Sequence, residues 1–101
     1  MTFRLAIIGS GGIAEKHLQS LKELSDFKIS WICDIDEEKA NNLANNYPGS
    51  QIEDNMDKII ANTEIDIVDI CLPPHLHFST AFRFLEAGKH VICEKPISTS
   101  V

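Results

Sequence analysis

A glycine-rich turn close to the amino terminus constrains the fold of this chain more than any other feature. Gly9, Gly11 and Ala14 fit the pattern G-x-G-x-x-G/A, which follows an apolar run and opens a helical pattern. In such a turn Gly9 permits a tight exit from a strand, Gly11 lets the backbone approach a pyrophosphate, and Ala14 lets the helix pack closely on the strand. The amino terminus of the helix then offers unpaired N–H groups and a partial positive charge to phosphates.

An aspartate stands at the distance that this kind of turn requires. Asp34 lies twenty residues after Ala14, where such folds place an acid on the ribose of an adenosine. A 2′-phosphate there would meet a like charge, and the nearest cation is Lys39, beyond Ile35 and Asp36. The sequence therefore favours NAD over NADP. Two alternatives remain: a glycine turn without a ligand, and a solvated helix-capping acid, which fits Asp36 better than Asp34.

Apolar runs alternate with helical patterns along the whole chain. The expected strands are Arg4–Ile8, Lys28–Cys33, Gln51–Ile52, Ile67–Leu72 and His90–Cys93, and the expected helices are about Gly12–Leu24, Glu37–Asn46, Asn55–Ala61 and Leu76–Ala87. This alternation predicts an α/β fold, a Rossmann-type doubly wound parallel sheet with helices on both faces. Residues Ile97–Val101 resemble the opening of a fifth helix. We therefore expect a Rossmann domain over residues 1–101 that is truncated before its last helix and strand.

Helix ends and helix faces can also be read from the pattern. Asp36 is a candidate N-cap for the second helix and Asp54 for the third, while Gly88 is suited to end the fourth. One stripe of the fourth helix is apolar at helical spacing, and we interpret it as part of the core. This stripe consists of Phe78, Ala81, Phe82 and Leu85.

Composition excludes several classes of protein. The chain has 101 residues, of which 44% are hydrophobic, and a formal net charge of -6. A chain of this length supports one core, and its acidity argues against a nucleic-acid partner. There is no apolar run of about 18 residues and no leader pattern, so we expect a cytoplasmic protein without membrane contact. The three cysteines form no C-x-x-C pair, which favours buried thiols over a metal site.

In a parallel sheet, the loops that follow the strands gather at one edge, where ligands bind. Besides the glycine turn and Asp34, that edge would collect the segments Leu72–His77 and Glu94–Pro96. The prolines of the first segment suit an extended loop beside adenine or ribose, or simply end a strand. His77 has either a role near the cofactor or an ordinary place at the start of a helix.

Glu94, Lys95 and Pro96 directly follow the last apolar run. An acid and a base at this edge suit hydrogen bonds to a nicotinamide ribose or a substrate hydroxyl. A partly desolvated lysine there has a proton affinity that can be tuned for acid–base work. The alternative is a surface ion pair, which contributes less than about 1 kcal/mol.

In these motifs the sequence resembles the glucose–fructose oxidoreductase and inositol dehydrogenase (Gfo/Idh/MocA) family across its whole length. The resemblance rests on Ile8–Ala14 with His17, on Asp34, on Leu72–Pro74 with His77, and above all on Ala87–Pro96, which is similar to the signature A-G-K-H-V-x-x-E-K-P. It implies an N-terminal NAD(P)-binding Rossmann domain and a C-terminal α/β domain, absent from this sequence, that holds most of the substrate site. It further implies that Lys95 contacts nicotinamide ribose and substrate and assists proton transfer, that Glu94 positions that end of the cofactor, and that the Lys95–Pro96 bond is cis.

The sequence is thus interpreted as the nicotinamide-dinucleotide-binding domain of an oxidoreductase. Hydride would pass between NAD, or less favourably NADP, and a secondary alcohol of a sugar, cyclitol or related polyol, with Lys95 as the catalytic residue. The expected cofactor-binding residues are Gly9, Ser10, Gly11, Gly12, Ile13, Ala14, Asp34, Leu72, Pro73, Pro74, His77, Glu94 and Lys95. The expected partners are a small-molecule substrate, held through the missing domain, and further copies of the chain in a homo-oligomer.

Three rival interpretations stay open at this point. The chain could be an NAD-binding regulatory module without turnover, or a relative that cleaves glycosides through transient oxidation with bound NAD. A methyltransferase also carries a glycine-rich loop after its first strand. The sequence Glu94-Lys95-Pro96 speaks against the methyltransferase and, more weakly, against the regulator.

Overall fold

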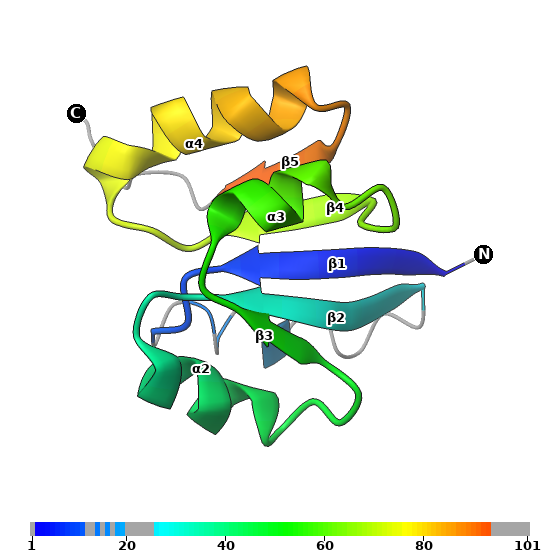
Figure 1. The fold of residues 1–101 in the computed structure, drawn as a ribbon, viewed down its shortest axis with the longest axis vertical. Helices are drawn as coiled ribbons and strands as arrows, with labels where there is room; N and C mark the ends of the chain where they lie inside the picture. The colour runs from blue at the N-terminus through cyan, green and yellow to red at the C-terminus, as the bar shows by residue number, and fades with distance from the viewer. Residues whose placement is uncertain (1, 12–13, 15, 17, 20–25, 94–101) are drawn as a thin grey trace.

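The structure, a computed structural model, describes residues 2–11, 14, 16, 18–19 and 26–93 (Figure 1). Its strands are β1 (Phe3–Ile8), β2 (Phe27–Cys33), β3 (Gln51–Glu53), β4 (Ile67–Ile70) and β5 (His90–Cys93), and its helices with full bounds are α2 (Glu37–Ala44), α3 (Met56–Ala61) and α4 (Pro74–Glu86). Between β1 and β2, the described residues Ala14, Lys16, Leu18 and Gln19 have helical backbone. No helix among the described residues is long and apolar enough to span a bilayer.

All five strands are parallel, in the spatial order β3-β2-β1-β4-β5. The chain builds outward from β1 to β3 on one side and then returns to build β4 and β5 on the other (Figure 1). The strand order therefore reverses at the carboxyl end of β1, which is where α/β sheets bind ligands. The predicted Rossmann-type parallel sheet is confirmed.

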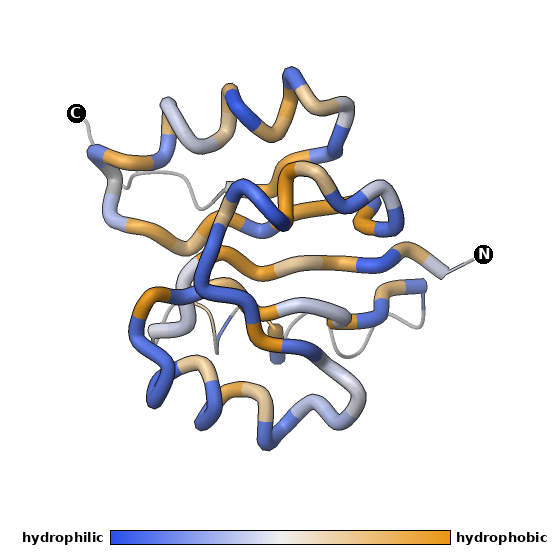
Figure 2. Tube along the Cα trace, in the orientation of Figure 1, coloured by the Kyte–Doolittle hydropathy of each residue, from blue (hydrophilic) through white to orange (hydrophobic). Residues whose placement is uncertain are grey.

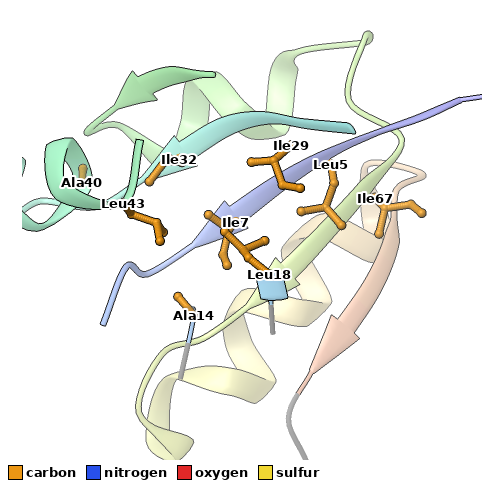
Figure 3. Close-up of a cluster of buried hydrophobic side chains, with 9 residues drawn as sticks. All are labelled: Leu5, Ile7, Ala14, Leu18, Ile29, Ile32, Ala40, Leu43 and Ile67. Atoms are coloured by element: carbon orange, nitrogen blue, oxygen red, sulfur yellow. The ribbon is translucent and has the colours of Figure 1, made fainter. Parts of the chain in front are cut away.

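The central strand β1 sends alternate side chains to two separate cores. Leu5 and Ile7 join a cluster that includes Ala14, Leu18 and, from α2, Ala40 and Leu43 (Figure 3). Ala6 and Ile8 join a second cluster on the opposite face, which α3 and α4 cover with Ile59 and Phe84. Hydrophobic residues accordingly run along β1 and β4, while hydrophilic ones are frequent on α2 and α3 (Figure 2). Helices cover both faces, as the alternation of elements predicts.

The predicted core stripe of α4 is wrong for three of its four residues. Phe78 is 84% exposed, Phe82 54% and Leu85 58%, whereas Phe84 is fully buried and Thr80 nearly so. Only Ala81 of that stripe packs against the core. The helix carries apolar residues on two flanks, and its sequence alone does not distinguish which of them meets the sheet.

A contact with α3 shows how α4 is rotated. Arg83 of α4 forms an ion pair with Asp57 of α3, which places that flank of the helix toward α3. Phe78 and Leu85 lie roughly 140–160° away from Arg83 around the helix and therefore face away from α3. The helix also begins two residues earlier than expected, because Pro74 lacks an N–H and fits the first helical turn. Of the two prolines, only Pro73 has extended backbone.

The helix caps are partly as expected. Asp36 caps α2 by accepting a hydrogen bond from the backbone N–H of Lys39, at 3.2 Å. Asn55, and not Asp54, caps α3, because the Asn55 side chain accepts from the N–H of Asp57 at 2.9 Å. Gly88 follows α4 with φ of 83°, the left-handed conformation expected of a residue that ends a helix.

Lys89 is a buried charged residue with a structural role, which the sequence alone does not indicate. Its side chain is buried, and Nζ donates to the carbonyl oxygens of Asn62 at 2.7 Å and Ile65 at 3.3 Å. Burial lowers the pKa of Lys89, although the charge of Asp66 opposes this shift. The ammonium group thereby ties the start of β5 to the loop before β4, at the edge of the sheet opposite the glycine turn.

The rotation of α4 predicts unequal effects of two similar substitutions. Phe84→Ala should lower the free energy of unfolding by about 3–5 kcal/mol, because it removes a fully buried ring. Phe78→Ala should change it by less than about 0.5 kcal/mol, because that ring is mostly in solvent. Urea unfolding followed by circular dichroism measures both values, and equal losses would contradict the observed rotation.

Candidate functional site

The turn after β1 passes through a position that only glycine can occupy. Gly9 has φ of 95°, and a Cβ atom there would lie 2.7 Å from the carbonyl oxygen of Cys71. The N–H of Gly9 donates to the carbonyl of Cys33 at 2.8 Å, and the N–H of Cys71 donates to Ile8 at 2.8 Å. Gly9 is therefore fixed between the ends of β2 and β4, and close backbone packing requires its missing side chain as much as the turn does.

Gly11 is glycine for a different reason. It is exposed, and a Cβ atom added there would meet no atom within 4 Å. The protein's own packing therefore does not require glycine at this position, and the open backbone suits the close approach of a phosphate group. Ala14 is fully buried in the core beneath the helical segment, as its place in the motif predicts. Gly12 and Ile13 lie outside the described residues.

The acid at the end of β2 is bonded directly to the glycine turn. One carboxylate oxygen of Asp34 accepts from both the N–H of Ser10, at 2.9 Å, and the Ser10 hydroxyl. The other oxygen accepts from the N–H of Asp36 at 2.8 Å. A carboxylate has about four acceptor sites, so Asp34 keeps capacity for a further donor such as a ribose hydroxyl. The Ser10–Asp34 bond was not predicted, although a serine between the two glycines and a distant acid are its sequence signal.

The environment of Asp34 favours the charged carboxylate. Burial by itself raises the pKa, but the hydrogen bonds from Ser10 and Asp36 outweigh it, so the pKa of Asp34 lies below its ordinary value. These hydrogen bonds therefore orient a negatively charged carboxylate beside the turn at neutral pH.

The segment after β4 reaches the same place. Leu72 lies beside the turn, with its Cδ2 atom 3.4 Å from the position of a Cβ on Gly9. Pro73 is exposed, and Pro74 is the first residue of α4. The Nε2 atom of His77 is buried and has no hydrogen-bond partner in the part of the chain that the structure describes. His75, by contrast, is exposed.

The last predicted segment lies outside the described residues. β5 ends at Cys93, which pairs with Ile70 of β4. Glu94, Lys95 and the Lys95–Pro96 bond follow it and lie outside the described part, as does His17. The structure therefore brings together the glycine turn, Asp34 and the segment after β4. Within the described ranges, no group of three histidine, cysteine or acidic side chains is arranged to hold a metal ion.

The parallel sheet, the open glycine turn and the acid bonded to it define a Rossmann-type domain. Similarity to known proteins identifies its family. A family model described as an oxidoreductase family with an NAD-binding Rossmann fold matches residues 3–101. The chain belongs to this family of NAD(P)-dependent oxidoreductases, the Gfo/Idh/MocA family that the motifs indicate. The turn and the acid in the structure fit the dinucleotide that the family description names, because Gly11 is open and Asp34 is charged.

Particular relatives share this part of their sequences with the chain. It is 33% identical to the inositol 2-dehydrogenase/D-chiro-inositol 3-dehydrogenase of Shouchella clausii, over 99% of the chain and 30% of that protein. It is 34% identical to the D-glucoside 3-dehydrogenase of Escherichia coli, over 92% of the chain and 27% of that protein. The solved structure of the WlbA dehydrogenase of Chromobacterium violaceum, in complex with NADH and UDP-GlcNAcA, superimposes with a TM-score of 0.86 at 31% identity, over 98% of the chain and 29% of that structure. The chain thus spans about 30% of the length of its relatives.

The two glycines of the turn should respond differently to alanine. Gly9→Ala should lower the free energy of unfolding by about 2 kcal/mol or more, since it combines a left-handed backbone with a contact on the Cys71 carbonyl. Gly11→Ala meets no neighbour and should leave stability nearly unchanged. Thermal and urea unfolding of both variants measure this difference, and a fully stable Gly9→Ala variant would contradict the close packing of Gly9 against the Cys71 carbonyl.

The charge of Asp34 predicts a specific pH dependence. Because its folded-state pKa lies below the unfolded value of about 3.9, ionised Asp34 stabilises the fold above that pH, and this contribution is lost as the pH falls through the folded pKa. The difference in unfolding free energy between wild type and Asp34→Asn should therefore be largest near neutral pH and shrink below about pH 4. Urea unfolding at a series of pH values tests this, with Ser10→Ala as a variant in which the dependence should weaken. A difference that grows on acidification would refute it.

Proposed function

We propose that the chain is the cofactor-binding domain of an oxidoreductase that transfers hydride between NAD and a secondary alcohol of a sugar, cyclitol or related polyol. One observation carries this proposal: an open glycine turn at the switch point of the sheet is hydrogen-bonded through Ser10 to a charged Asp34. The inositol and glucoside dehydrogenases among the relatives support the substrate class. The relative solved with NADH supports the cofactor.

Each loop at the carboxyl ends of the strands has a proposed role in binding or catalysis. The backbone of Gly9–Ala14 binds the pyrophosphate, and the Asp34 carboxylate accepts hydrogen bonds from the adenosine ribose. Leu72, Pro73, Pro74 and His77 flank the cofactor on the β4 side. When bound, the nicotinamide supplies the site that accepts or donates hydride. Lys95 contacts its ribose and moves the proton of the substrate hydroxyl, and Glu94 positions that end of the cofactor.

The rest of the substrate site is proposed to come from outside this chain. The relatives are about three times as long, and we propose that a C-terminal domain completes the site as the family resemblance implies. We further propose that the complete protein is a cytoplasmic homo-oligomer. Residues 1–101 then bind the cofactor but turn over little or no substrate.

Cofactor binding tests this function directly. Wild type should bind NADH, and Gly11→Val should weaken binding at least tenfold, because a branched side chain would occupy the open space beside the backbone. Isothermal titration calorimetry measures the affinity, and circular dichroism should show an unchanged fold. Gly11→Ala is the matched control and should weaken binding less. Undiminished binding by Gly11→Val would show that this turn does not hold the phosphates.

A further inference from the structure

A pocket that includes Asp34 is lined mainly by acidic residues. It has a volume of about 280 Å³ and lies at the carboxyl ends of β2 and β3. Its lining residues are Asp34, Ile35, Glu37, Ile52, Glu53 and Asp54. Four of these six side chains are carboxylates, and no lysine or arginine stands among the described residues that line it. The pocket is therefore a region of strongly negative electrostatic potential directly beside the proposed adenosine ribose site.

The acids of β3 are held close to Asp34 by the sheet itself. Glu53 pairs with Cys33 in the register of β2 and β3, and its carbonyl accepts from the N–H of Asp34 at 3.2 Å. The Glu53 carboxylate accepts from the N–H of Asn55 at 3.0 Å, which orients it at the end of the strand. These backbone and side-chain bonds fix the acidic end of β3 against the acid of β2.

The field of these carboxylates reaches the end of β2. The pKa of the Cys33 thiol is raised to about 11, first by burial and then by the charges of Glu53, Asp34 and Asp54. A negatively charged group placed in the pocket would be repelled by the same carboxylates, although it would be less buried than the Cys33 thiol. Charges that line one small pocket are separated by distances comparable to the Debye length, about 8 Å at physiological ionic strength, so screening does not remove the repulsion.

We propose that Glu53 and Asp54 act together with Asp34 as an electrostatic filter that excludes the 2′-phosphate of NADP from the ribose site. This inference rests on the proposed function and deepens it, because it assigns cofactor selection to a second strand. A phosphate carries a charge of about −1.5 to −2, so every carboxylate lining the pocket opposes it. Removing the charge of Asp34 alone leaves the acids of β3 in place, and the preference for NAD persists in reduced form.

The test measures the ratio of the dissociation constants of NADP and NAD by calorimetry. Wild type should favour NAD, and the double variant Glu53→Gln/Asp54→Asn should lower the ratio about tenfold, since both substitutions remove charge and keep shape. Asp34→Asn should lower it as well, and the triple variant most of all. Glu64→Gln, which removes the same charge from an exposed residue at the amino-terminal edge of the sheet, should leave the ratio unchanged.

A salt series on wild type supplies a measurement that does not depend on any variant folding. The ratio should fall as sodium chloride is raised from about 0.02 to 0.5 M, because the repulsion is screened. The filter is overturned if the ratio of the dissociation constants is independent of salt, or if it stays within twofold of wild type in a folded double variant. In either case, binding of NAD by wild type still supports the proposed function. If wild type binds neither cofactor, the proposed function fails and the filter fails with it.

Discussion

The structure depends on the close approach of three strand ends around Gly9. The turn after β1 passes within contact of the Cys71 backbone, and hydrogen bonds from Gly9 to Cys33 and from Cys71 to Ile8 hold the ends of β2 and β4 to β1. A side chain at Gly9 would separate these strands. The strand order reverses here, and Gly11, two residues further along the turn, is open to solvent. Fold and candidate site are therefore products of one constraint.

The charge distribution follows from the same arrangement. Asp34 is bonded to Ser10 and Asp36, so the acid that would bind a ribose also braces the turn that would bind the phosphates. The end of β3, paired with the end of β2, adds the carboxylates of Glu53 and Asp54 to this region. A local bond thus orients one carboxylate, whereas strand pairing determines how many carboxylates gather around it. The bond to Ser10 governs the orientation of the Asp34 carboxylate, and the pairing of β2 with β3 governs how much negative charge surrounds it.

The two faces of the sheet explain why β1 is apolar at consecutive positions. Leu5 and Ile7 are buried on the face of α2, and Ala6 and Ile8 on the face of α3 and α4. A strand covered on both sides needs apolar residues throughout, which is how a parallel sheet differs in sequence from an antiparallel one with a solvated face. Lys89 and Asp69 are the charged residues buried in the described part of the chain, and two carbonyl oxygens accept hydrogen bonds from the Lys89 ammonium.

By itself, the sequence determined the class of fold, the order of elements and the place of the glycine turn. Those properties depend on local spacing: two glycines, an alanine and alternating apolar runs are visible without knowledge of any partner. The cap of α2 at Asp36 is equally local and is confirmed.

Only the tertiary structure decided which flank of α4 is buried, since Phe84 and Phe82 are alike as residues and differ only in what lies opposite them. It also decided that Asn55 caps α3 and that Ser10 binds Asp34. The acidic pocket depends on the pairing of β2 with β3, between residues some twenty positions apart. Such features arise from contacts between distant segments, and a periodic pattern along one chain contains no information about the geometry with which those segments meet.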